Sequence, residues 1–476
     1  MQRYKEKTIK NSTPENSKKS VGKDEMMIIN PNAAGIDIGS RFHVVAVPSS
    51  SSDQPIREFS STTTSVLEMA KWLKSCRVTT IAMESTGSYW IPVYEILEEK
   101  GFEVYLVNAQ FVKNVPGRKS DYRDADWIQR LHTFGLLSKS FRPQDHCLKL
   151  RSLTRQHSKL ISHRSPHILH MQKALQEMNI QLHTHIRDIT GVTGMNIITA
   201  ILNGERDINK FAQLVHPKCK NSAEKIAESL LGNYRGEHLF ILGQAKDLYF
   251  YYSEKIEECE REIQKALDEL AVQTKNEVSP IATGKLSSAS EEIAQPLKGS
   301  SKKTKKKKGI SFDAAPKLSA IVGVDLTCIP GIDQATALKI VAELGGCVDA
   351  WSSAKRFASW MGLCPGNKIS GGKVLSSKTK TCPNRLAQLL RMAANGLWNS
   401  KSYLGAFLRR MRGRLGGMKA ITCGAHKLAR IVYVMIKEGI NYEDLGEEFY
   451  EKRYQERRLK NIERQAKEYG MKLIPV

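Results

Sequence analysis

Four acidic residues near the start of the chain have the type and the surroundings expected of a metal site. Asp37 lies inside an apolar stretch, between Ile36 and Ile38, and Glu84 ends the apolar run that begins at Ile81. A carboxylate inside an apolar strand is costly to bury unless it is paired or binds a metal. An actin-like nucleotide-binding strand is an alternative context for Asp37.

The other two acids are Asp121 and Asp124, which stand three residues apart. On a helix this spacing places both carboxylates on one face, whereas Asp126 would point away from it. Mg²⁺ prefers oxygen ligands, and two ions about 4 Å apart can activate water and stabilise a leaving oxygen during phosphodiester cleavage. Because basic residues flank this pair, ordinary surface ion pairs are the alternative interpretation.

A serine near the C-terminus is a candidate nucleophile. Ser370 precedes Gly371-Gly372 and follows Gly366, so we expect it at the tip of an exposed loop with unusual backbone angles. A lone Ser-Gly-Gly is usually a turn, and a serine hydroxyl is a poor nucleophile without activation. Three lysines nearby could bind a phosphate, although the sequence names no general base: Lys368, Lys373 and Lys378.

The elements that would position the acids alternate between strands and helices. A β-hairpin is predicted over residues 34–47, strands over 79–84 and 102–108, and a helix over 89–100. This alternation indicates an α/β sheet domain that ends near residue 145.

Later segments have a helical pattern. Residues 253–271 place apolar side chains at three- and four-residue steps, which predicts a packing stripe of a coiled coil or helical hairpin. The predicted organisation is a disordered basic arm (1–30), the α/β domain (31–145), a helical or coiled-coil region (146–272), a Lys/Ser-rich linker (273–316) and a mostly helical C-terminal domain (317–476).

Two features of the C-terminal domain favour contact with nucleic acid. The Pro330-Gly331 turn before a helix is similar to a helix-hairpin-helix, whose backbone N–H groups bind phosphate. Asp333 stands where that motif has a second glycine, so helix packing is an equal alternative. Residues 401–420 hold six basic residues and no acid, which suits a nucleic-acid face or a solvated helix.

Composition agrees with a polyanionic partner. Lys and Arg total 73 against 49 Asp and Glu, a net charge of +24. A merely basic protein, or one that binds acidic membranes, has the same composition.

No apolar run reaches the roughly 18 residues of a membrane span, and residues 1–27 do not resemble a secretory signal. Nine scattered cysteines without a CxxC pair indicate free thiols.

Taken together, the motifs resemble a known family. The run Gly35-Ile-Asp-Ile-Gly, Met83-Glu-Ser-Thr-Gly-Ser-Tyr89, Leu106-Val-Asn and Val115-Pro-Gly-Arg-Lys-Ser-Asp-Tyr-Arg-Asp-Ala125 is similar to the DEDD transposases of insertion sequences, the IS one-ten family, in particular its IS eleven-eleven branch. Ile329-Pro-Gly, Gly362-Leu-Cys-Pro365, Ser370-Gly-Gly, Asn384-Arg-Leu, Met392-Ala-Ala394 and Ala425-His-Lys-Leu-Ala-Arg430 resemble the transposase domain of the same family.

The resemblance covers nearly all of residues 34–470. It implies a RuvC-like N-terminal domain with an RNase H fold, in which Asp37, Glu84, Asp121 and Asp124 bind Mg²⁺, two ions being expected. It implies that Ser370 joins covalently to DNA when the element is excised and inserted. Donor and target DNA, a structured guide RNA encoded by the element (the bridge-recombinase type) and a homo-oligomer, dimer or tetramer, are the implied partners. The implied location is the bacterial or archaeal cytoplasm, at the nucleoid.

Two other functions remain open from the sequence. One is a RuvC-like metal-dependent nuclease that hydrolyses DNA without a covalent intermediate. The other is a non-catalytic nucleic-acid-binding protein.

Overall fold

The computed structural model describes residues 27–85, 87–108, 121–277, 309–382, 384–472 and 474. Almost all of the predicted basic arm (1–30) and most of the predicted linker (273–316), including its lysine cluster, lie outside these residues. The chain divides into two compact units, residues 1–142 and 143–476, which are described separately.

The first unit is built on a mixed five-stranded sheet with the order β3-β2-β1-β4-β5. β1 is antiparallel to β2 and parallel to β4, β2 is antiparallel to β3, and β4 is parallel to β5. The strands are β1 (Ala33–Ile38), β2 (Phe42–Ala46), β3 (Ile56–Ser60), β4 (Thr80–Glu84) and β5 (Glu103–Val107). The predicted hairpin and both later strands are therefore present, whereas β3 was not predicted.

Alternation along the strands gives the sheet two apolar faces. Helices α1 (Thr63–Ser75) and α2 (Trp90–Glu99) cover one face, where Ile36, Ile81 and Met83 are fully buried. Helix α4 (Asp121–Thr133) covers the other, where Ala125 and Ile128 pack against small and branched strand residues. The α/β prediction for this part of the chain is confirmed.

Close approach of α4 to the sheet depends on Gly35 in β1. A Cβ at this position would lie 2.3 Å from the backbone nitrogen of Gln129 and 2.5 Å from the carbonyl oxygen of Ala125. Any side chain there would push the helix away, because real Cβ contacts are not this short. The glycine in the Gly-Ile-Asp sequence thus sets the distance between α4 and the strand that carries Asp37.

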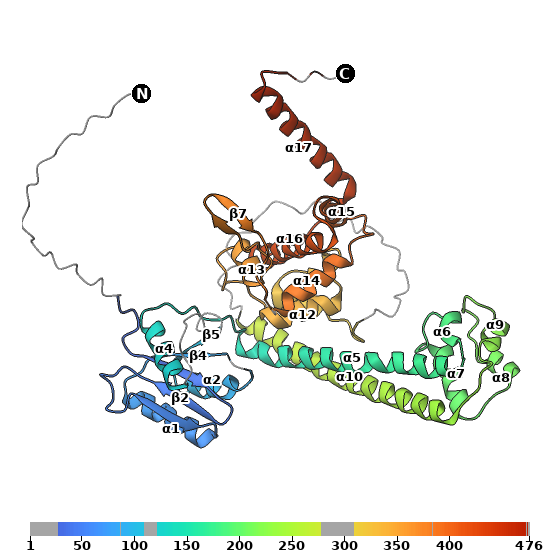
Figure 1. Cartoon of the computed structure of the whole chain (residues 1–476), viewed down its shortest axis with the longest axis horizontal. Coiled ribbons are helices and arrows are strands. Elements are labelled where there is room, and N and C mark those ends of the chain that lie inside the picture. The colour runs from blue at the N-terminus through green and yellow to red at the C-terminus, as the bar shows by residue number, and fades with distance from the viewer. Residues whose placement is uncertain are drawn as a thin grey trace, which may run out of the picture. The chain divides into compact units, whose positions relative to one another are not determined.

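A long helical hairpin begins the second unit. Figure 1 shows α5 (Asp145–Glu177) and α10 (Gly236–Glu277) side by side. They run antiparallel, because Lys149 pairs with Glu269 near one end and Glu177 pairs with His238 near the other. The predicted apolar stripe is confirmed: Ile256, Cys259, Ile263, Ala266 and Leu270 are all buried.

Four short helices cap the far end of the hairpin around a separate apolar core (Figure 1). Ile197, Ile198 and Phe211 are almost fully buried in it. The helices are α6 (Leu182–His185), α7 (Val192–Leu202), α8 (Ile208–Gln213) and α9 (Ala223–Glu228).

The remainder of the second unit is helical with one small hairpin. Its elements are α11 (Ala315–Val322), a 3₁₀ turn (Leu326–Cys328), α12 (Gln334–Leu344), α13 (Ala354–Trp360), β6 (Lys368–Ser370), β7 (Lys373–Ser376), α14 (Arg385–Asn395), α15 (Tyr403–Leu415), α16 (Gly417–Glu438) and α17 (Gly446–Glu468). Helix α16 packs against α13, α14 and α15 and is the centre of this group.

All nine cysteines are free thiols, as the spacing predicts. Within the described ranges, every helix is too short or too polar to cross a lipid bilayer.

Candidate active site

Asp37 and Glu84 lie on adjacent parallel strands at the same edge of the sheet. Ile36 of β1 is in register with Met83 of β4. Asp37 directly follows Ile36 and Glu84 directly follows Met83, so the two acids occupy equivalent positions on the two strands. Ile36 and Met83 face the core under α1 and α2. Because side chains alternate along a strand, the two acids belong to the opposite face, which α4 covers.

Helix α4 adds the remaining acids of the predicted set. Asp124 directly precedes Ala125, whose carbonyl oxygen lies against Gly35, and it is half-buried. Asp121 is the first residue of α4, so the pair does lie on a helix, and the Asp121 side chain lies outside the described part of the chain. Asp126 pairs with Arg130 one turn further on, at 3.1 Å. This ion pair agrees with leaving Asp126 out of the site.

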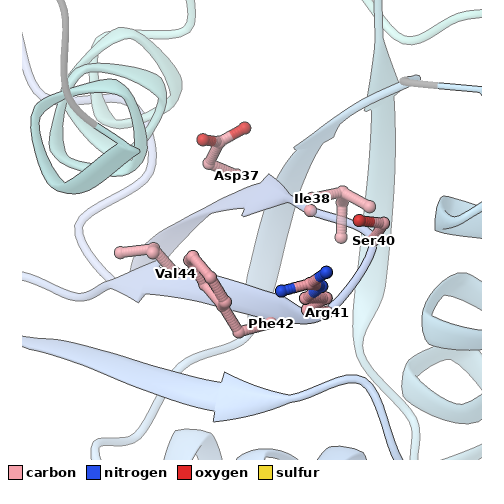
Figure 2. Close-up of a pocket in the computed structure, with 7 residues that line it drawn as sticks. Asp37, Ile38, Ser40, Arg41, Phe42 and Val44 are labelled. Carbon is pink, nitrogen blue, oxygen red and sulfur yellow. The ribbon is translucent and has the colours of Figure 1, made fainter.

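A cavity of about 270 Å³ opens beside Asp37 at the turn of the β1–β2 hairpin. In Figure 2 the Asp37 carboxylate stands off the ribbon of β1, while Arg41 and Phe42 line the cavity from the turn and β2. One acid and one guanidinium therefore border the same open space. An arginine can bind phosphate oxygens through two parallel N–H donors.

The contact between α4 and the sheet includes a buried neutral histidine. His132 hydrogen-bonds through Nε2 to Thr80 Oγ1 of β4 at 2.9 Å, and its ring lies 4.7 Å from that of Tyr105. Burial lowers the His132 pKa to about 4, because the charged ring would lose its hydration. His132 is therefore uncharged at neutral pH and fixes the end of α4 to β4.

The donor types fit Mg²⁺, which takes carboxylate oxygens. Asp37, Glu84 and Asp124 are carboxylates placed on one side of the sheet by β1, β4 and α4. Among the side chains that the structure describes, three His, Cys, Asp or Glu groups do not gather closely enough to hold an ion. The fit of these residues to Mg²⁺ therefore rests on their carboxylate oxygens and on the side of the sheet that they share.

Asn108 is a further polar residue at this edge that the site prediction missed. It follows β5 directly, and the last residue of β5, Val107, is in register with Glu84. The carboxyl ends of parallel strands meet at one edge, so Asn108 lies beside the strand that carries Glu84. The signal in the sequence is a polar side chain immediately after an apolar strand.

Ser370 lies in the second unit, at the end of a strand and not at the tip of a loop. It is the last residue of β6 and pairs with Lys373 of β7. Gly371 and Gly372 form the tip, with φ values of +54° and +74°, and two successive positive φ values are typical of a tight type I′ turn. The glycines shape a hairpin that presents the serine, and its hydroxyl is exposed.

The described surroundings of Ser370 contain no activating base. Its Oγ has no hydrogen-bond partner among the described residues, and Ile369, Val374 and Leu375 of the same hairpin are exposed to 63%, 60% and 69%. A serine in this environment needs groups from outside the hairpin to become a nucleophile.

The Pro330-Gly331 turn takes part in helix packing, and the helix-hairpin-helix interpretation stays a prediction. Asp333 is the N-cap of α12, and its carboxylate accepts a hydrogen bond from the Thr336 backbone nitrogen at 2.8 Å. The cap occupies the place where a phosphate would bind the helix N-terminus. Gly331 lies against α14, because a Cβ there would be 2.9 Å from the Ala393 carbonyl oxygen.

The basic run 401–420 has acidic neighbours that its own sequence does not contain. Arg409 pairs with Glu447 at 2.6 Å and Arg410 with Glu451 at 3.4 Å, both on α17. Part of the charge on α15 is therefore neutralised by helix packing and is not a free nucleic-acid face.

One lysine on α16 lies in a strongly basic environment. Lys427 lies 4.3 Å and 4.4 Å from the ring centroids of Tyr403 and Phe407. Burial, followed by the charges of Arg457, Arg453 and Arg430, lowers its pKa to about 8. Close to neutral pH, this amine loses its proton far more readily than an ordinary lysine.

Two family models match the chain. Residues 34–180 match the DEDD transposase model of the IS110 family, and residues 325–408 match the transposase model of the IS116/IS110/IS902 family. No curated protein matches. Residues 34–180 are therefore similar to a DEDD transposase domain and residues 325–408 to a C-terminal transposase domain, and the two matches together support an insertion-sequence transposase.

Proposed function

We propose that this transposase breaks and rejoins DNA strands through a covalent bond between Ser370 and a backbone phosphate, assisted by two Mg²⁺ ions. The observation that carries the proposal is the position of Asp37 and Glu84 on adjacent parallel strands, on the face that α4 and Asp124 cover. The strand order β3-β2-β1-β4-β5 supports a RuvC-like, RNase H type fold for this domain.

Ser370 is the nucleophile in this mechanism. Its Oγ attacks the phosphorus of the scissile linkage, the bond between oxygen and phosphorus forms, and the bond to the displaced strand oxygen breaks. The hydroxyl proton passes to water or to a base that completes the site in the working assembly. Attack by a second strand's oxygen on the same phosphorus releases Ser370 and joins the strands. Exposure on a tight hairpin gives the hydroxyl access to the DNA backbone.

Asp37, Glu84, Asp121 and Asp124 would hold the two ions. When bound, Mg²⁺ supplies positive charge that stabilises the displaced oxygen. The sheet and α4 position these carboxylates, and Gly35 sets how closely the sheet and the helix approach each other.

The proposal assigns a role to each part of the chain. Residues 31–145 form the metal-binding RuvC-like domain, 146–272 the helical hairpin region, 273–316 the linker, 317–476 the transposase domain with Ser370, and 1–30 a basic arm. The enzyme is of the bridge-recombinase type of the IS eleven-eleven branch and is guided by an RNA that the element encodes. It acts as a dimer or tetramer on donor and target DNA in the nucleoid. The exposed apolar residues of the Ser370 hairpin support a site completed by another domain or subunit.

The covalent step is tested with a nicked suicide DNA substrate on denaturing gels. We expect a protein–DNA adduct that Ser370→Ala abolishes and that Ser376→Ala and Ser377→Ala retain, since these serines lie outside the Ser-Gly-Gly motif. Asp37→Asn and Asp124→Asn should also abolish it. DNA hydrolysis that survives Ser370→Ala would instead establish the metal-dependent nuclease.

The guide and the assembly are tested separately. Sequencing of nucleic acid that co-purifies with the protein should recover one structured RNA from beside the gene, and random host fragments would contradict guidance. Mixing the inactive Asp37→Asn and Ser370→Ala proteins should restore adduct formation if sites are shared between subunits. Failure of the mixture, with each variant still oligomeric, would contradict shared sites.

A further inference from the structure

A second cavity lies in the C-terminal unit, between the base of the long hairpin and the transposase helices. It measures about 410 Å³ and is formed by α5, α12 and α14. Arg155 and Ser158 line it from α5, Lys339 and Glu343 from α12, and Arg385 and Met392 from α14. None of these residues belongs to the metal site or to the Ser370 hairpin.

Among the described residues that line this cavity, the acid Glu343 already has its partners. Arg155 reaches both carboxylate oxygens of Glu343 at 2.8 Å, and Arg151 Nε donates to Glu343 Oε2 at 2.9 Å. Burial opposes ionisation of Glu343, but the hydrogen bonds from Arg155 and the charges of both arginines outweigh it and lower its pKa. The carboxylate is held ionised and is not available to other cations.

Two further cations of the cavity have no acid to pair with. Among the residues that the structure describes, Lys339 and Arg385 form no ion pair or hydrogen bond through their side chains. With Arg151 and Arg155 they make four cations around one carboxylate. Mutual repulsion of this kind favours binding of an anion, which would relieve it.

Crowding of the cations also affects Arg151. Burial lowers its pKa, Glu343 raises it, and Arg155 and Arg385 lower it again. Arg385 therefore acts electrostatically on the buried pair, although it is itself exposed. The cavity is a single positively charged site made by three helices.

The chemistry of the lining identifies the anion. Arg385 offers planar N–H donors and Lys339 a point charge, the two groups that commonly bind phosphate. The N-terminus of α14 is already capped by Asn384, which accepts from the Ala387 nitrogen at 3.1 Å, so side chains must supply the contacts. Met392 is 74% exposed at the edge of the cavity and offers apolar surface beside the charges. A sugar-phosphate unit offers a charged phosphate for Arg385 and Lys339 and the C–H surface of its sugar for Met392.

We infer that the cavity between α5, α12 and α14 binds a backbone phosphate of nucleic acid, with Lys339 and Arg385 as its principal contacts. The site is independent of sequence, because its donors meet a phosphate and not base edges. It extends the proposed function by a contact outside the catalytic residues. The same phosphodiester chemistry occurs in DNA and in RNA, so the test compares both.

Binding is measured by fluorescence anisotropy with full-length protein, in EDTA so that strand cleavage does not contribute. The probes are a random-sequence DNA duplex and a random single-stranded RNA, each over a salt series. The test variant is Lys339→Gln with Arg385→Gln. The matched control is Lys71→Gln with Lys225→Gln, which removes the same charge from exposed positions on α1 and α9.

We expect the test variant to bind at least one probe about tenfold more weakly and to reduce the salt dependence by about one released counterion. The control should bind nearly as the unmodified protein does. The probe that is affected identifies the nucleic acid that occupies the cavity. An equal loss in both variants would mean a general charge effect and would overturn the site, as would no loss in the test variant.

A second measurement does not depend on any substitution. Lys339 of the unmodified protein should be protected from an amine-reactive label when the DNA duplex or the single-stranded RNA is bound, while Lys71 should label as before. Unchanged labelling of Lys339 in the complex would overturn the inference. Protection by inorganic pyrophosphate with none by either nucleic acid would also overturn it, because the cavity would then be a small-anion site. Each of these results is independent of whether Ser370 forms an adduct.

Discussion

Substitution of Gly35 by alanine is expected to damage the proposed metal site without changing any of its proposed ligands. A Cβ at residue 35 would lie 2.3 Å from the Gln129 nitrogen, and ordinary contact begins at 3.4 Å, so α4 must move away by about 1.1 Å. The clashing atoms are backbone atoms of α4, which cannot swing aside as a flexible side chain would. Asp124 moves with the helix, whereas Asp37 and Glu84 stay in the sheet.

The size of the effect follows from this displacement. A misplacement of about 1 Å in a catalytic constellation can lower a rate about 100-fold, and overpacking of a core costs about 1–3 kcal/mol of stability. We expect Gly35→Ala to form the Ser370–DNA adduct about 100-fold more slowly and to need more Mg²⁺. The midpoint of thermal unfolding should fall moderately.

The assay is the rate of adduct formation at several Mg²⁺ concentrations, with circular dichroism and DNA binding in EDTA to verify that the variant folds. Gly236→Ala is the matched control, because a Cβ at Gly236 would meet nothing within 4 Å. If Gly35→Ala kept both its rate and its Mg²⁺ requirement, the contact between β1 and α4 would not govern the site and the reasoning would be refuted.

Three other perturbations test the remaining electrostatic arguments. Glu343→Gln should lower the free energy of unfolding in urea by about 3 kcal/mol, because it leaves Arg151 and Arg155 without a counter-charge. Glu262→Gln, which removes an exposed ion pair with Lys265, should cost under about 0.5 kcal/mol, and equal costs would contradict this account. Unfolded His132 takes up a proton near pH 6.5 and folded His132 near pH 4, so the stability that it contributes above pH 6.5 is lost as the pH falls towards 4. The melting temperature of His132→Gln should therefore fall less across this range, and an identical pH profile would show that His132 does not titrate there. The amine of Lys427 should react with an amine-specific label with an apparent pKa of about 8, and Arg457→Gln should raise that pKa; an ordinary lysine profile would contradict the repulsion.

Local sequence was sufficient for the elements whose apolar pattern is strong. The hairpin around Asp37 and the strand ending at Glu84 lie where alternation and turn residues predict them. β3 was missed because its residues, Ile-Arg-Glu-Phe-Ser, are half polar and belong to an edge strand, whose exposed side weakens the apolar signal.

The sequence by itself determined which residue types are candidates for the chemistry: four carboxylates, a serine before two glycines and a large excess of basic residues. Tertiary structure decided which charges remain available, because pairing depends on neighbours that are distant along the chain. Arg409 and Arg410 meet acids of α17, and Arg155 meets Glu343, whereas Lys339 and Arg385 come together in a cavity without such a partner among the described residues. The closeness of α4 to β1 was likewise decided in three dimensions, since only the packing shows why residue 35 must lack a side chain.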